Sequence, residues 1–178
     1  MSHPAQLQFV EDVKRNYVNL FFRKKVLEVG SLNINGSIRG FFIECDYTGV
    51  DIEPGPGVDL VARGENLDFP DESFDVVASC ECFEHNPEWV RTFDNMTRMA
   101  RSLVFFSCAT TGRPEHGTRR ATPQDAPFCG DYYQNLKASD FLEKCNLKPY
   151  LHYSFVVNKA AQDLYFIGIK KPGENHGG

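Results

Sequence analysis

Two stretches, Val26-Leu27-Glu28-Val29-Gly30 and Tyr47-Thr48-Gly49-Val50-Asp51, decide the fold of this chain. Each is a short apolar run that ends abruptly in residues suited to binding a ligand. Because the carboxyl ends of parallel strands meet at one edge of a sheet, these residues are expected to form a pocket for a nucleoside. The carboxylate of Asp51 can accept hydrogen bonds from both ribose hydroxyls, and Gly30 lets the backbone approach the ligand closely.

Strands and helices alternate along the rest of the chain. Residues 5 to 22 have apolar side chains at helical spacing, and strands are predicted near 58 to 62, 74 to 79 and 103 to 107. A helix from Asn86 to about Arg101 is predicted to have asparagine as its N-cap and proline at its first position. A short helix at 139 to 145 and two strands, 147 to 157 and 164 to 170, follow. This order predicts an α/β fold with a mostly parallel sheet and an antiparallel edge.

The segment from 52 to 57 leaves two topologies open. It has the sequence Ile-Glu-Pro-Gly-Pro-Gly, whereas parallel neighbouring strands usually need a crossover of a dozen or more residues. Six extended residues reach about 20 Å, which covers the return along a short strand. A helix-free parallel crossover is therefore feasible, and an antiparallel hairpin through Pro-Gly-Pro-Gly is the alternative.

Composition is that of an ordinary globular protein. The chain has 178 residues, of which 42% are hydrophobic and 24% charged, and we expect one domain over residues 1–172 with a flexible tail at 173–178. The sequence shows no apolar run of membrane-spanning length and no signal core, so a cytoplasmic protein without membrane contact is expected. The net charge of −5 argues against a large nucleic-acid-binding surface. Composition leaves the oligomeric state open.

The six cysteines are scattered and are predicted to be free thiols. Cys80-Glu81-Cys82, with His85 nearby, could suggest zinc. This spacing lacks the second ligand pair of a structural zinc site, so no metal is predicted.

Four ordered motifs resemble those of class I S-adenosylmethionine-dependent methyltransferases, and most closely the small-molecule type. They are residues 26–30, residues 49–51, the stretch Leu67-Asp68-Phe69-Pro70-Asp71-Glu72-Ser73-Phe74-Asp75-Val76-Val77, and Glu84-His85. The resemblance implies a Rossmann-like three-layer sandwich around a mostly parallel seven-stranded sheet with an antiparallel last strand. It also implies S-adenosyl-L-methionine as cofactor and S-adenosyl-L-homocysteine as product.

The resemblance further implies a role for particular residues. Glu28 would hold the methionine ammonium through water, Asp51 the ribose hydroxyls, and Ile52 would pack on the adenine. The turn from Gly30 to Gly36 would pass beneath the cofactor. The cofactor-binding residues expected on this basis are Glu28, Gly30, Ser31, Leu32, Gly36, Asp51, Ile52, Arg63, Gly64, Glu65, Cys80 and Glu81.

The chain departs from the family pattern at two places. Leu32 and Ile34 stand where glycines are usual, and Arg63 stands near the place of an aspartate that binds the adenine amino group. Arginine cannot accept that hydrogen bond, which leaves Glu65 or a backbone carbonyl for it. Glu28, a carboxylate inside an apolar strand, needs a partner such as a bound ammonium or a backbone donor in the turn.

Candidate catalytic and substrate residues follow strands four and five. His85 and His116 are the candidate bases, because imidazole titrates near neutrality, although His85 could equally be a structural residue at a helix entry. The long loop from 109 to 135 contains Arg113, Arg119, Arg120, Tyr132 and Tyr133, which could bind a phosphate, carboxylate or sugar. A solvated charge run is the competing interpretation.

The sequence therefore predicts a methyltransferase that acts on a small anionic or hydroxylated acceptor, with O-methylation favoured. The N-terminal helix, within 1–24, and the 109–135 loop would meet the acceptor. A catalytically silent module that only binds the cofactor is the alternative. A nicotinamide-dependent reductase is less favoured, because residues 30–36 lack the Gly-x-Gly-x-x-Gly pattern, and a nucleic-acid modifier is not favoured.

Overall fold

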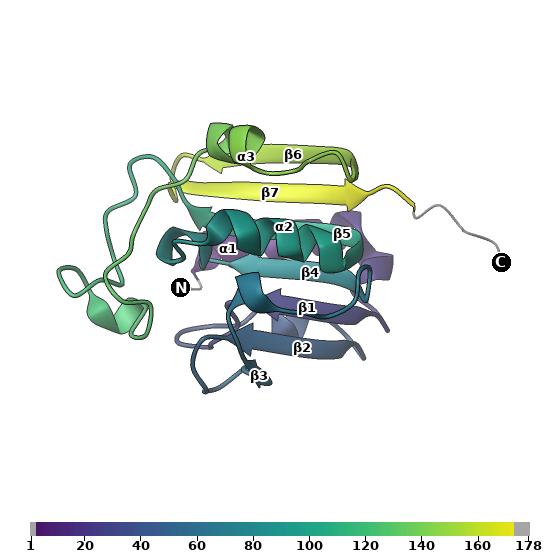
Figure 1. Cartoon of the computed structure of the whole chain (residues 1–178), viewed down its shortest axis with the longest axis horizontal. Helices are drawn as coiled ribbons and strands as arrows, with labels where there is room; N and C mark the ends of the chain where they lie inside the picture. The colour runs from purple at the N-terminus through teal and green to yellow at the C-terminus, as the bar shows by residue number, and fades with distance from the viewer. Residues whose placement is uncertain (1–2, 173–178) are drawn as a thin grey trace.

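The computed structural model describes residues 3–172 (Figure 1). The tail predicted at 173–178 lies outside these residues. One sheet has the strand order β3-β2-β1-β4-β5-β7-β6. Its strands are β1 (Lys25–Val29), β2 (Asp46–Asp51), β3 (Leu60–Val61), β4 (Phe74–Cys80), β5 (Ala100–Ala109), β6 (Tyr150–Asn158) and β7 (Asp163–Lys170). The helices are α1 (Pro4–Asn16), α2 (Trp89–Met99) and α3 (Ala138–Lys144), with short 3₁₀ segments at Val18–Leu20, Arg39–Phe41, Gly64–Asn66, Phe83–His85 and Pro123–Asp125.

The predicted fold class is confirmed. Strands β1 to β5 pair in parallel, whereas β7 runs antiparallel to both β5 and β6. Because β2 and β3 are parallel, residues 52–57 form the short crossover, and the hairpin alternative is wrong. The carboxyl ends of β1, β2 and β4 therefore meet at one edge of the sheet.

Helices cover both faces of the sheet (Figure 1). On one face, α2 and α3 bury Phe93 and Phe141 against Phe106 of β5. On the other face, Phe9 of α1 packs against Phe105 of β5. Strand β5 contributes side chains to both cores because successive residues point to opposite faces. In the part of the chain that the structure describes, no helix is long and apolar enough to cross a membrane.

Several element boundaries differ from the prediction. Helix α2 begins at Trp89 rather than near Asn86, because the Asn86 side chain accepts a 2.8 Å hydrogen bond from the Glu88 amide and forms a turn before the helix. Helix α1 ends at Asn16, and a 3₁₀ segment follows it within the predicted 5–22 range. Strand β3 has only two residues, whereas β5 extends over ten.

Gly49 in β2 is required by close packing at the edge that carries the site. A Cβ atom at this position would overlap the carbonyl oxygen of Gly57 and lie 2.7 Å from Ser31 Oγ. We expect Gly49→Ala to lower the free energy of unfolding by about 1–3 kcal/mol, measured by urea denaturation. Gly40→Ala is the matched control, since a Cβ there would meet no atom within 4 Å. Equal stability of the two variants would contradict this description of the packing.

Candidate active site

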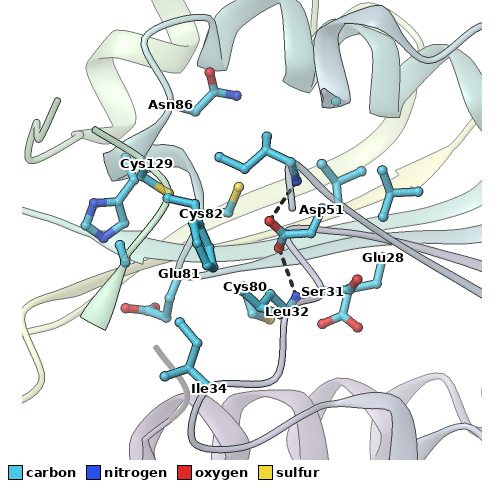
Figure 2. A pocket seen from close by; sticks show the side chains of 18 of the residues that line it. Glu28, Ser31, Leu32, Ile34, Asp51, Cys80, Glu81, Cys82, Asn86 and Cys129 are labelled. Carbon is cyan, nitrogen blue, oxygen red and sulfur yellow. Dashed lines mark hydrogen bonds between the residues drawn. The ribbon is translucent and has the colours of Figure 1, made fainter. Parts of the chain in front are cut away.

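A cavity of about 310 Å³ opens at the carboxyl ends of β1, β2 and β4 (Figure 2). The turn after β1, the segment after β3 and residues of the 125–132 stretch complete its walls. The structure places all the residues predicted to bind the cofactor along this cavity: Glu28, Gly30, Ser31, Leu32, Gly36, Asp51, Ile52, Arg63, Gly64, Glu65, Cys80 and Glu81. Segments far apart in the sequence therefore line the same cavity.

Asp51, the last residue of β2, is held by the backbone around it. The amide of Leu32 donates to Oδ2 at 2.9 Å, and the amide of Ile52 donates to Oδ1 at 2.7 Å (dashed lines in Figure 2). Burial raises the pKa of Asp51, and these backbone hydrogen bonds partly oppose that increase. Each carboxylate oxygen keeps a lone pair that can accept a further hydrogen bond. Asp51 is therefore oriented to accept two neighbouring hydroxyl groups.

Glu28 in β1 is buried and is hydrogen-bonded to a side chain that its sequence motif does not indicate. Tyr47 of β2 donates its hydroxyl to Glu28 Oε2 at 2.6 Å. Burial raises the pKa of Glu28 to about 7, although this hydrogen bond acts in the opposite direction. The register of β1 and β2 explains this contact. Gly49 of β2 is paired with Glu28, and Tyr47, two residues before Gly49, points to the same face of the sheet as Glu28.

Gly30 makes the turn after β1 tight. Its φ of +83° is disfavoured for residues with a side chain, and a Cβ atom would lie 2.7 Å from Cys82 Cβ. The amides of Gly30 and Ser31 both donate to the carbonyl of Val50, at 2.8 and 3.1 Å. This turn keeps β1 and β2 together where the cavity begins.

The segment after β3 presents a buried carboxylate to the cavity. The side chain of Glu65 is 6% exposed, whereas that of Arg63 is 60% exposed. Thr92 of α2 donates to Glu65 Oε2 at 3.3 Å, and Gly64 packs closely against Thr92 and Val29. Of the two side chains, Glu65 can accept a hydrogen bond from a ligand amino group, and Arg63 cannot.

Glu81 follows β4 with a φ of +53°, which turns the chain sharply at the cavity wall. Its side chain is directed to protein partners: Ser107 donates to Oε1 at 2.8 Å, and Arg113 Nη2 lies 3.8 Å from Oε2. Glu81 therefore helps to position the end of β4 through contacts with β5 and the loop after it.

His85 and His116 are brought together behind the same wall. Their ring centroids lie 5.0 Å apart, and Tyr133 packs against both rings. His85 lines the cavity, whereas His116 is not among its lining residues. Burial lowers the pKa of His85 to about 3, helped by the neighbouring His116, and burial also lowers the pKa of His116. Both imidazoles are therefore neutral at pH 7.

The arginines predicted to bind the substrate do not line the cavity. Arg113 donates to Asp163 Oδ1 and to the carbonyl of Ala161, both at 2.7 Å. Arg119 and Arg120 have side chains that are 84% and 74% exposed. Of the two predicted tyrosines, Tyr132 lines the cavity and Tyr133 packs on the histidine rings. The three arginines therefore do not form one binding cluster.

Other residues line the cavity without having been predicted. They come from α1, from the turn after β1, from the stretch after β4 and from the 109–135 loop, and include Gln6, Asn35, Cys82, Asn86, Asp125, Phe128, Cys129 and Asp131. Figure 2 shows Cys82 and Cys129 near one another on the side where Asn86 lies. The loop does reach the cavity, but mainly through residues other than its arginines.

Comparison with known sequences gives a family match. A family model described as a methyltransferase domain matches residues 35–107. Curated relatives from Mycobacterium tuberculosis and Mycobacterium bovis, named phthiotriol/phenolphthiotriol dimycocerosates methyltransferase, are 31% identical over 127 residues. The match covers 58% of this chain and 47% of each relative, so the chain spans about half the length of these proteins.

Solved structures share the fold. The Burkholderia thailandensis 1,6-didemethyltoxoflavin-N1-methyltransferase, with bound 1,6-didemethyltoxoflavin and S-adenosylhomocysteine, has a TM-score of 0.64 at 13% identity and covers 94% of this chain and 79% of its own. The CurJ carbon methyltransferase scores 0.65 at 11% identity, covering 93% and 54%. A Haemonchus contortus phosphoethanolamine N-methyltransferase scores 0.65 at 13% identity, covering 93% and 53%.

Proposed function

We propose that this chain, which shares the fold and a family match of S-adenosylmethionine-dependent methyltransferases, methylates a small anionic or hydroxylated acceptor, with oxygen as the favoured target. The cofactor supplies an activated methyl group on its sulfonium. The observation that carries the proposal is Asp51, whose two carboxylate oxygens are oriented by backbone amides and open on the cavity. This arrangement suits a ribose diol.

The residues present fit the rest of the cofactor. Glu28, buried at the cavity wall, is a carboxylate that can stabilise the methionine ammonium, directly or through water. Ile52 can pack on the adenine, and Glu65 can accept from the adenine amino group. The twelve cofactor residues expected from the sequence are proposed to act together on this basis.

The acceptor is proposed to bind on the side of the cavity formed by His85, Phe128, Cys129 and Tyr132. A hydroxyl acceptor must lose its proton as the methyl group transfers. His85 is the proposed base, because of the two histidines it is the one that lines the cavity. His116 lies behind it and is proposed to orient the ring of His85. Arg119 and Arg120, exposed on the same loop, are proposed to attract an anionic acceptor rather than to contact the methyl group.

Incubation of the purified protein with methyl-labelled S-adenosylmethionine and a panel of small hydroxylated, carboxylated and phosphorylated compounds tests the proposal. We expect labelled product from at least one hydroxylated compound and its loss in His85→Asn. The exposed His152→Asn variant is the control and should retain transfer. Tight cofactor binding without transfer to any compound would favour the alternative of a catalytically silent binding module.

The raised pKa of Glu28 predicts a pH-dependent affinity for the cofactor. Since the folded pKa, about 7, exceeds the ordinary value of 4.5, the stability that protonated Glu28 contributes is present at low pH and declines as the pH rises to 7. The cofactor ammonium favours the ionised form. We therefore expect affinity to rise about tenfold from pH 6 to pH 8 and a proton to be released on binding below pH 7.

Titration calorimetry in two buffers of different ionisation enthalpy measures both effects. The Glu28→Gln variant should bind weakly and without this pH dependence. Glu143→Gln, on the exposed side of α3, is the matched control and should behave as the unmodified protein. A pH-independent affinity in the unmodified protein would contradict the assigned role of Glu28.

A further inference from the structure

Three buried residues beside the cavity have polar atoms without partners. Glu84, His85 and His116 are 0%, 6% and 8% exposed. Both carboxylate oxygens of Glu84, both ring nitrogens of His85 and Nε2 of His116 have no hydrogen-bond partner among the described residues. A buried polar atom without a partner lowers the stability of the fold by about 1–3 kcal/mol. Several such atoms in one place therefore indicate a binding site for a ligand or an ion.

These atoms face one another. One ligand atom from each of the three residues lies within 4.8 Å of the other two. The bonds of a transition metal to nitrogen or oxygen are about 2.0–2.2 Å, so two ligands of one ion lie at most about 4.4 Å apart. The three ligand atoms therefore lie near the separation that the ligands of one ion have.

The backbone holds the three residues in place. Glu84 and His85 belong to the 3₁₀ segment directly after β4, and the Gln134 amide donates to the Glu84 carbonyl at 2.9 Å. His116 lies in the loop after β5. The neighbouring Gly117, at φ +65°, approaches His85 so closely that a Cβ atom would lie 2.7 Å from the ring atom Cε1. The loop is therefore packed directly on the histidine.

His116 has the orientation of a metal ligand. Its Nδ1 lies 3.1 Å from the carbonyl of Pro114, which places the ring proton on Nδ1 and leaves the lone pair of Nε2 directed to the cluster. Metal-binding histidines commonly donate their second nitrogen to a carbonyl in this way.

The chemistry of the three side chains suits a small cation. A carboxylate and two imidazole lone pairs are all acceptors, and in the described part of the chain no lysine or arginine forms an ion pair with Glu84. Of the three residues, only His85 lines the cavity, so the space between them suits an ion rather than an organic molecule.

We propose that Glu84, His85 and His116 form a binding site for a divalent first-row transition metal cation. Two imidazoles and one carboxylate suit zinc, cobalt, iron or nickel better than magnesium or calcium, which prefer oxygen ligands. The cation ties the loop after β5 to the end of β4 beside the cavity. A bound cation also prevents His85 from acting as the proposed base. One ring nitrogen of His85 then binds the cation and the other already carries a proton, so neither can accept a proton from the acceptor.

Titration of the chelator-treated protein with Co²⁺, followed by visible absorption, and with Zn²⁺, followed by calorimetry, tests the site. We expect one equivalent of either ion to bind and Co²⁺ to give ligand-field bands typical of nitrogen and oxygen ligands. Glu84→Gln and His116→Asn should each weaken binding at least about tenfold. These titrations measure cation binding alone. A protein that did not bind the cofactor or transfer a methyl group could therefore still bind the cation, and the two proposals are tested separately.

Two histidine variants serve as controls. His152→Asn changes an exposed histidine of β6 and should not affect binding. His3→Asn alters the other group of possible ligands, His3, Glu81 and Asp163, where Arg113 already pairs with Asp163. Circular dichroism establishes that each variant is folded, and Glu84→Gln conserves the shape of the side chain while removing a carboxylate ligand. Absence of saturable binding, or loss in His3→Asn with retention in both Glu84→Gln and His116→Asn, would overturn the proposal.

Discussion

Replacement of Asp51 by asparagine is expected to weaken the binding of S-adenosylhomocysteine by roughly 100-fold or more. A hydrogen bond to a charged group contributes about 1.5–3 kcal/mol, and Asp51 is proposed to accept two from the ribose. In the unmodified protein the amides of Leu32 and Ile52 donate hydrogen bonds to the Asp51 carboxylate. The NH₂ group of asparagine cannot accept a hydrogen bond, so one of these two amides loses its acceptor. Titration calorimetry of the folded variant measures the loss.

The matched control is Asp46→Asn. Asp46 is the first residue of the same strand, exposed and at the end far from the cavity. It should bind S-adenosylhomocysteine as the unmodified protein does. Equal affinity of the Asp51 variant and the unmodified protein, or an equal loss in both variants, would show that Asp51 does not bind the nucleoside.

Replacement of Arg113 by methionine is expected to lower the free energy of unfolding by about 3–5 kcal/mol, because removing one partner of a buried ion pair leaves the other charge without compensation. Arg113 Nη1 lies 2.7 Å from Asp163 Oδ1, and the side chain of Asp163 is 0% exposed. Tyr165 donates its hydroxyl to the other oxygen of Asp163 at 3.1 Å, which keeps part of the compensation and favours the lower end of the range. Urea denaturation measures the effect.

Arg119→Met is the control for this variant. The Arg119 side chain is 84% exposed and 3.6 Å from Asp131, and exposed pairs contribute at most about 1 kcal/mol. If Arg113 served mainly to bind an acceptor, its replacement would raise the KM for the acceptor and leave stability unchanged. That result would contradict the structural role that its contacts indicate.

The sheet and the cofactor side of the cavity could be predicted because their signals are local. An apolar run that ends in Glu28 and Gly30, or in Asp51, marks both a strand and the chemistry at its end. The boundary of α2 could not be predicted as well, since Asn86 is suited both to an N-cap and to the turn that it forms before Trp89.

The acceptor side could not be predicted as well, because its contacts link residues distant in sequence. The loop from 109 to 135 has no periodic pattern, so Arg113 was predicted to bind the substrate from the composition of the loop alone. Its actual partner, Asp163, lies 50 residues later in the sequence. Phe128 and Cys129 reach the cavity only through the path of that loop. Glu84 belonged to a recognised motif, but its lack of partners and its position beside His116 appear only in three dimensions.

The most direct test of the central claim is a crystal structure of the protein with S-adenosylhomocysteine. We predict the nucleoside in the cavity between β1, β2 and β4, with its two ribose hydroxyls at hydrogen-bond distance from Oδ1 and Oδ2 of Asp51 and its amino group on the side of Glu28. A nucleoside bound elsewhere, or bound in this cavity without contact to Asp51, would contradict the account.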